Sequence, residues 1–334
     1  SGSIVAAFNN HPHPGGPGMG LARSGDGGTS WQTNSLTYPI NFVTGIPMAD
    51  MFDPTITADE QGQLYVVGIA TDFNWSNGPV NGIYSYTSSD DGLTWSAPVV
   101  IDTQRSAIAA VDPNYRLNDR CQVRADIHQT STYQGNVYVA WIQDRGWMSG
   151  PFSDIYVSFS SDRGQSYRVA QRINDPPTRM GNMPTLDIGR DGAVYVCWID
   201  YNVTIGGIGR LYLDHSSDGG QTWHNDQRID SFLLLPLFLN ANTDVRAKGA
   251  AVIRTAPNAD SVLYIAYAAD PDGTGPDEGD IFFIRSADRG RNWSSPLRVN
   301  DDNTLNDQVL PWMEVAALAS PPSPLGSNRH WTWR

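Results

Sequence analysis

The chain has 334 residues, and its 35 acidic side chains outnumber 22 basic ones, which gives a formal charge of −13 at pH 7. This balance argues against nucleic acid or an anionic membrane surface as a partner, because both attract basic proteins. Only 17% of the residues are charged, whereas 11 Trp, 14 Tyr, 32 Gly and 22 Pro are typical of a turn-rich β protein that is secreted, extracellular or periplasmic. We expect a monomer, and we expect no membrane span, since no apolar run approaches the roughly 20 residues needed.

One short pattern, Ser-x-Asp-x-Gly-x-(Thr/Ser/Asn)-(Trp/Tyr), occurs five times along the chain. Its copies span residues 24–31, 88–95, 160–167, 216–223 and 286–293. Successive copies are 64, 72, 56 and 70 residues apart, a long period that indicates repeated supersecondary units. In each copy we expect Asp to accept hydrogen bonds from turn amides and Gly to adopt a conformation closed to other residues.

This pattern is the Asp-box, and the chain resembles the sialidase-like β-propellers that carry it. The resemblance spans nearly the whole chain through its boxes. It implies an all-β fold of four-stranded blades, with the boxes on the rim and a glycan bound on another face. The residues of the sialidase reaction are only partly matched: Gly45-Ile46-Pro47 follows the first box and lacks the expected Arg, and no Tyr occurs after Tyr267.

The strands can be placed in chain order around these boxes. Each box lies between two short alternating strands, and two more strands precede them, which makes four strands per unit. The first unit lacks its innermost strand, because the chain opens on the apolar segment 3–8. The last unit has one to spare, at residues 309–315. We therefore predict one propeller domain over residues 1–334, with five blades and with residues 309–318 paired to residues 3–9; a six-bladed ring is the alternative.

Charged side chains near the starts of the predicted inner strands mark the candidate site. Since inner strands from several blades converge, these side chains can meet around a small ligand in a central funnel. We assign catalytic roles to Glu314, Asp50 and Asp53. We assign substrate binding to Arg120, Arg124 and Arg246. The alternative for each Arg is a structural ion pair with a neighbouring carboxylate.

A loop rich in Asp and Gly follows the fourth apolar strand, from Asp270 to Asp280. Closely spaced carboxylates supply the hard oxygen ligands that Ca²⁺ prefers. We expect Asp270, Asp272, Asp277 and Asp280 to include calcium ligands, and no organic cofactor. A solvated acidic loop without a metal is the alternative.

Two functions fit this sequence. The first is a glycan-active enzyme of the sialidase-like type, a glycoside hydrolase with carboxylates in the funnel as acid and base. The second is a non-catalytic propeller that binds carbohydrate or protein in the same place. Propellers host both, so the site has to decide between them.

Overall fold

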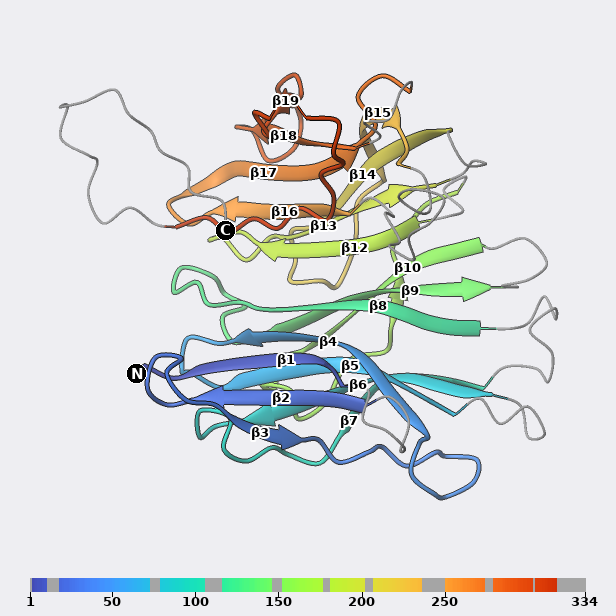
Figure 1. Cartoon of the computed structure of the whole chain (residues 1–334), viewed down its shortest axis with the longest axis vertical. Helices are drawn as coiled ribbons and strands as arrows, with labels where there is room; N and C mark the ends of the chain where they lie inside the picture. Colours follow the sequence, from blue (N-terminus) through green and yellow to red (C-terminus); the bar gives the residue numbers. More distant parts are fainter. Residues whose placement is uncertain are drawn as a thin grey trace.

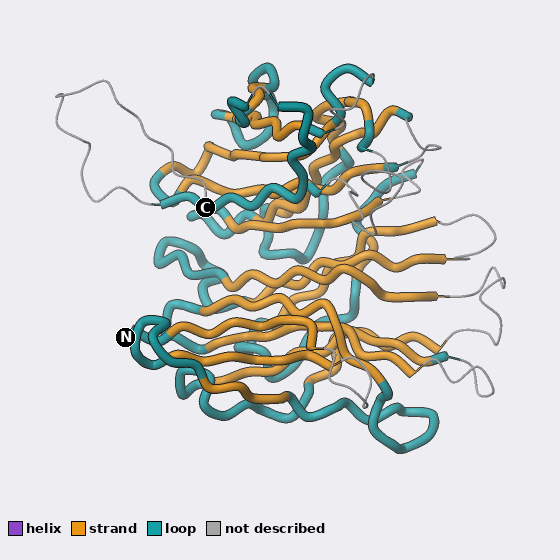
Figure 2. Tube along the Cα trace, in the orientation of Figure 1, coloured by secondary structure: helices purple, strands orange, loops and turns teal. Residues whose placement is uncertain are grey.

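The computed structural model describes residues 2–10, 18–72, 79–105, 116–145, 152–176, 181–201, 207–235, 250–273, 279–302 and 304–316. Within these ranges the chain consists of strands and loops without a helix (Figure 2). No helix long and apolar enough to cross a membrane is found among them.

The strands form five antiparallel sheets, one of three strands and four of four strands. The first sheet comprises β1 (Ile4–Asn10), β2 (Gly18–Ser24) and β3 (Gln32–Ser35). The second comprises β4 (Asp50–Ala58), β5 (Leu64–Asp72), β6 (Val80–Ser88) and β7 (Val99–Arg105), and the third comprises β8 (Arg116–Ala125), β9 (Val137–Arg145), β10 (Phe152–Ser160) and β11 (Gln171–Arg172). The fourth comprises β12 (Gly181–Ile188), β13 (Val194–Asp200), β14 (Ile208–Ser216) and β15 (Gln227–Leu233), and the fifth comprises β16 (Ala251–Ala256), β17 (Ala259–Ala269), β18 (Asp280–Ser286) and β19 (Leu297–Arg298).

Successive sheets pack face to face, which explains why some strands are buried along their whole length. All seven residues of β13 are buried, because sheets cover it on both sides. Trp141 of β9 and Trp198 of β13 are fully buried, and burial of such a side chain contributes about 1.5–3 kcal/mol. The first strands lie in series, β1 beside β4, β4 beside β8, β8 beside β12 and β12 beside β16 (Figure 1). This architecture is consistent with a β-propeller of five blades.

The five Asp-boxes form the hairpin turns between the last two strands of each sheet, and the predicted role of their Asp is confirmed. In the fourth box the amide of Thr222 donates to Oδ1 of Asp218 at 2.8 Å, and the amide of Gly220 donates to Oγ of Ser216 at 2.8 Å. The other boxes repeat both bonds. Each box Gly has a φ between 81° and 96°, a region that side chains disfavour. The boxes are therefore structural staples.

The predicted pairing of residues 309–318 with residues 3–9 is wrong for the residues that the structure describes. There β1 pairs as a strand with β2 alone, and residues 304–316, the C-terminal segment, form no strand. The segment instead covers the fifth sheet, where Met313 packs on Val252 and Ala266. In the described parts, β1 and β16, the first and last inner strands of the series, make no contact comparable to those between neighbouring inner strands.

A bulge recurs near the start of three inner strands and shapes the centre of the molecule. The register shifts at residues 52–55 of β4, 119–122 of β8 and 182–185 of β12. Within each bulge one residue has positive φ: Asp53 (53°), Arg120 (56°) and Met183 (51°). Leu310 of the C-terminal segment repeats this conformation, with a φ of 55°. Bulges redirect side chains, and these three turn toward one central space.

Candidate functional site

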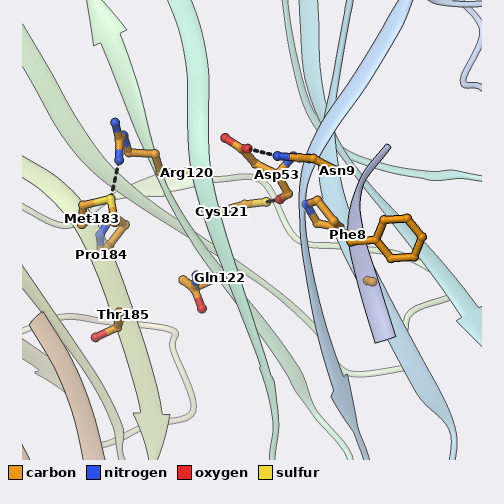
Figure 3. A pocket seen from close by; sticks show the side chains of 11 residues that line it. Phe8, Asn9, Asp53, Arg120, Cys121, Gln122, Met183, Pro184 and Thr185 are labelled. Carbon is orange, nitrogen blue, oxygen red and sulfur yellow. Dashed lines mark hydrogen bonds between the residues drawn. The ribbon is translucent and has the colours of Figure 1, made fainter. Parts of the chain in front are cut away.

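The first strands of the first four sheets meet around a cavity of about 360 Å³. Asn9 comes from β1, Asp53 from β4, Arg120 and Gln122 from β8, and Met183 from β12 (Figure 3). The volume lies at the lower end of the roughly 300–1,000 Å³ typical of small-molecule sites. The bulges therefore bring residues that are far apart in the sequence to one small, mostly polar space.

Asp53 is fixed in the cavity wall by reciprocal hydrogen bonds with Asn9. The amide of Asp53 donates to Oδ1 of Asn9 at 2.7 Å, and Nδ2 of Asn9 donates to Oδ1 of Asp53 at 3.0 Å. No Arg in the described ranges forms an ion pair with Asp53. The carboxylate is thus oriented by a neutral partner and keeps its negative charge available to a ligand.

Arg120 lies across the cavity from Asp53 and reaches toward β12 (Figure 3). Its Nε is 3.6 Å from Oδ2 of Asp119, and its Nη1 contacts the sulfur of Met183. Oδ1 of Asp119 also accepts the Arg120 amide at 2.9 Å. The only cation among the described lining residues is therefore already paired with a carboxylate next to it.

Cys121 is buried in the cavity wall between these two acidic groups. Burial raises the pKa of its thiol strongly, and the charges of Asp53 and Asp119 raise it further. The thiol donates to the carbonyl oxygen of Asp53 at 3.5 Å. Cys121 is consequently a neutral thiol at physiological pH, and two carboxylates lie close enough to influence it.

Arg124 and Glu314 belong to an ion-pair network that is separate from the cavity. Arg124 lies further along β8 than the cavity residues Arg120 and Gln122. Thr57, Arg124, Asp187 and Arg254 hold the same register position in β4, β8, β12 and β16, each opposite a Tyr. Nε of Arg124 is 3.7 Å from Asp187, and its Nη2 is 3.3 Å from Glu314. The ion pair between Arg124 and Asp187 thus links the third and fourth sheets.

Glu314 brings the C-terminal segment into this network through Arg254. The buried guanidinium of Arg254 donates to Oε1 of Glu314 at 2.8 Å and to Oε2 at 3.1 Å. Partial burial favours the neutral acid, but hydrogen bonds from Arg254 and Arg124 outweigh it and hold the pKa of Glu314 below its usual value. A carboxylate held ionised in this way is poorly suited to donate a proton.

The six predicted site residues are therefore not gathered at one place. Asp53 and Arg120 share the cavity, and Arg124 and Glu314 share the ion-pair network. Asp50 stands at the start of β4, where burial and the charge of Asp72 raise its pKa. Arg246 lies outside the described residues.

Sequence reasoning missed Asn9, Gln122 and Met183 as members of the cavity wall. A signal was present in the dipeptides Asp53-Pro54 and Met183-Pro184, which recur at the same place in two inner strands. Leu310-Pro311 repeats the pattern in the C-terminal segment. Proline restricts the residue before it and cannot donate to a sheet ladder, so this repeat marks the bulge.

The acidic loop after β17 is only partly described. Oδ1 of Asp270 accepts the amide of Asp272 at 3.1 Å, as in a turn, and Oδ1 of Asp280 is 2.8 Å from Nη2 of Arg298. Asp277 lies outside the described residues. Among those that are described, no group of three or more His, Cys, Asp or Glu is arranged to hold a metal ion. Calcium binding by this loop stays a prediction.

Comparisons with known proteins bear on the fold. No family model and no curated protein matches the sequence. The structure is similar to that of a protein of unknown function from Dyadobacter fermentans, with a TM-score of 0.56 and 14% identity over 89% of this chain and 79% of that one. It is also similar to an α-L-arabinanase from Penicillium chrysogenum solved with arabinobiose, with a TM-score of 0.52 and 17% identity over 87% and 76% of the two chains.

A microbial sialidase is a weaker structural likeness, with a TM-score of 0.48 and 18% identity over 90% of this chain and 57% of that one. At these identities the likenesses concern the fold. Together with the five sheets, the likeness to the arabinanase shows an all-β chain with the architecture of a β-propeller.

Proposed function

We propose that this protein acts on glycans in the central cavity, as a glycoside hydrolase. The observation that carries the proposal is the convergence of Asp53, Arg120 and Gln122, from two inner strands, on one cavity of small-molecule size. A carboxylate, a guanidinium and an amide can together accept from and donate to the hydroxyls of a sugar. The similar fold of an arabinanase solved with arabinobiose supports this choice of ligand.

Glycosidic hydrolysis commonly uses two carboxyl groups, one as proton donor and one as base or nucleophile. Asp53 lines the cavity, and Asp119 forms an ion pair with Arg120, which also lines it. The proposal therefore keeps Asp53 as the acidic group that contacts the ligand, and it takes Asp119 only as the partner that positions Arg120. It does not use Asp50 or Glu314, because neither lines the cavity.

The test is turnover of a panel of chromogenic glycosides and oligosaccharides by the wild type and by Asp53→Asn. Loss of a general acid or base costs about 10²–10⁴-fold in rate, so Asp53→Asn should abolish measurable turnover. Asp301→Asn, which changes an exposed carboxylate with no described partner, is the matched control. Turnover that Asp53→Asn leaves at the wild-type level would remove Asp53 from the mechanism.

A non-catalytic glycan-binding propeller is the second candidate, and one observation favours it. Asp53 is the only carboxylate among the described lining residues, whereas hydrolysis needs two. Binding of an oligosaccharide by calorimetry, lost in Asp53→Asn and unaccompanied by turnover of any panel member, would establish this second function.

A further inference from the structure

The charges around the central cavity identify the class of glycan that it can hold. Asp53 carries a negative charge with a neutral partner, Asn9. Arg120 carries the one positive charge among the described lining residues, and it is paired with Asp119 at 3.6 Å. The sum over Asp53, Asp119 and Arg120 is one net negative charge.

A carboxylated sugar needs a cation that is free to pair with it, ideally a guanidinium with both nitrogens directed at the carboxylate. Arg120 is instead directed at Met183 and Asp119. Arg124, four residues along β8, is engaged by Asp187 and Glu314 in the ion-pair network. Neither Arg120 nor Arg124 is therefore free to receive an anionic ligand.

A neutral sugar meets no such obstacle. The free oxygen of Asp53 can accept a hydroxyl, and the amide of Gln122 can both donate and accept. Pro54 and Pro184 contribute apolar surface to the lining, while Figure 3 shows the ring of Phe8 pointing away from the cavity. The wall thus combines uncharged hydrogen-bonding capacity with an unneutralised carboxylate.

We infer that the cavity selects neutral glycans and rejects sugars that carry a carboxylate, because Asp119 occupies Arg120 and Asp53 repels an anion. The inference rests on the proposed function and specifies its substrate class. Two like charges repel more strongly in a partly buried site than in water, so a carboxylate on the sugar should weaken binding about tenfold or more.

The experiment compares matched sugars that differ by one group. Xylo-oligosaccharides and arabino-oligosaccharides are titrated into the wild type by calorimetry beside oligogalacturonates and sialyllactose. We expect the neutral ligands to bind at least about tenfold more tightly than every carboxylated one. The preference should shrink as salt is raised, because screening weakens the repulsion.

Asp119→Asn tests the cause directly. This variant keeps the shape of the side chain but releases Arg120, so affinity for the carboxylated sugars should rise several-fold while that for neutral ones changes little. Asp301→Asn should leave the preference as it is, and melting curves check that each variant is folded. A wild type that prefers the neutral ligands while Asp119→Asn keeps the full preference would show that the Arg120–Asp119 pair is not the cause.

The remaining outcomes separate this inference from the proposal beneath it. Equal or tighter binding of a carboxylated sugar by the wild type overturns the inference and leaves a glycan-binding cavity in place. Failure of every sugar in both classes to bind overturns both.

Discussion

Asp53, Arg120 and Met183 show how single residues build the centre of this molecule. Each has a φ between 51° and 56°, although none is glycine, and each lines the cavity. Such conformations cost about 1–3 kcal/mol and persist only where the surrounding structure enforces them. Here the flanking sheet pairs enforce them, since regular pairing resumes at Thr55, Gln122 and Thr185. The cavity is thus shaped by backbone conformation as much as by side-chain choice.

Asp214 of β14 is a buried acid whose environment favours its neutral form. Burial raises its pKa to about 8, and the charges of Asp226 and Asp175 add to the effect. Oδ1 accepts the amide of His215 at 2.6 Å, whereas Oδ2 is buried without a hydrogen-bond partner among the described residues. The folded protein therefore binds this proton more tightly than the unfolded chain does.

The consequence is a pH dependence of stability with a definite sign. Because the folded pKa is raised, the cost of ionising Asp214 grows as pH rises from about 4 to about 8, and folding stability should fall across that interval. Asp214→Asn keeps an acceptor for His215 and removes the charge. Melting temperatures measured from pH 5 to pH 9 should fall less for the variant than for the wild type. Parallel curves would show that Asp214 is not the group responsible.

Residue types at the site could be predicted from the sequence better than their grouping. The sequence predicts Asp53 and Arg120 from their places near the starts of inner strands, and they do share a cavity. It also predicts Arg124 from the same strand as Arg120, but a residue four positions further along a strand lies roughly 13 Å away. Glu314 could not be placed, because its partners Arg254 and Arg124 depend on where the C-terminal segment packs.

At the scale of elements, the C-terminal segment is part of the fold without belonging to a sheet. Val309 and Met313 face the fifth sheet, and Glu314 pairs with Arg254. The guanidinium of Arg254 also lies 4.9 Å from the ring of Trp312. Apolar packing, an ion pair and a cation–π contact therefore hold this segment where a strand ladder is lacking.

Met313→Ala tests whether this packing stabilises the whole protein. Met313 is 8% exposed, and truncation of a buried Met costs about 2–5 kcal/mol, with the lower value expected for a segment that can adjust. Urea denaturation should show a loss of about 2 kcal/mol. Leu305→Ala, at a side chain that is 65% exposed in the same segment, should change stability little. Equal effects of the two substitutions would mean that the segment is not docked.

The elements themselves followed from the sequence to a large extent. The Asp-boxes predict the hairpin between the last two strands of each sheet, since their Ser, Asp and Gly make local hydrogen bonds that need no tertiary context. The partner of residues 309–316 was not predictable in the same way. An apolar alternating segment fits any exposed sheet face, and only the assembled molecule shows which one is free.

At the scale of the molecule, the sheets follow one another in chain order (Figure 1), and that order brings β1, β4, β8 and β12 to the same cavity. The repeat predicted the number of sheets. It could not predict closure of the ring, because contact between the two ends depends on the summed rotation between blades rather than on any one residue. The candidate site depends on the assembled sheets, since no single blade contains Asp53, Arg120 and Asn9 together.

The central claim is that this cavity is the ligand site. The most direct measurement is a crystal structure of the wild type with a neutral oligosaccharide such as arabinobiose or xylobiose. We expect a sugar hydroxyl within hydrogen-bond distance of the Asp53 carboxylate and of the Gln122 amide, with the Arg120–Asp119 pair intact. A ligand bound at the Asp-box rim or between outer strands, with the cavity lined by Asp53 and Arg120 left empty, would contradict the account.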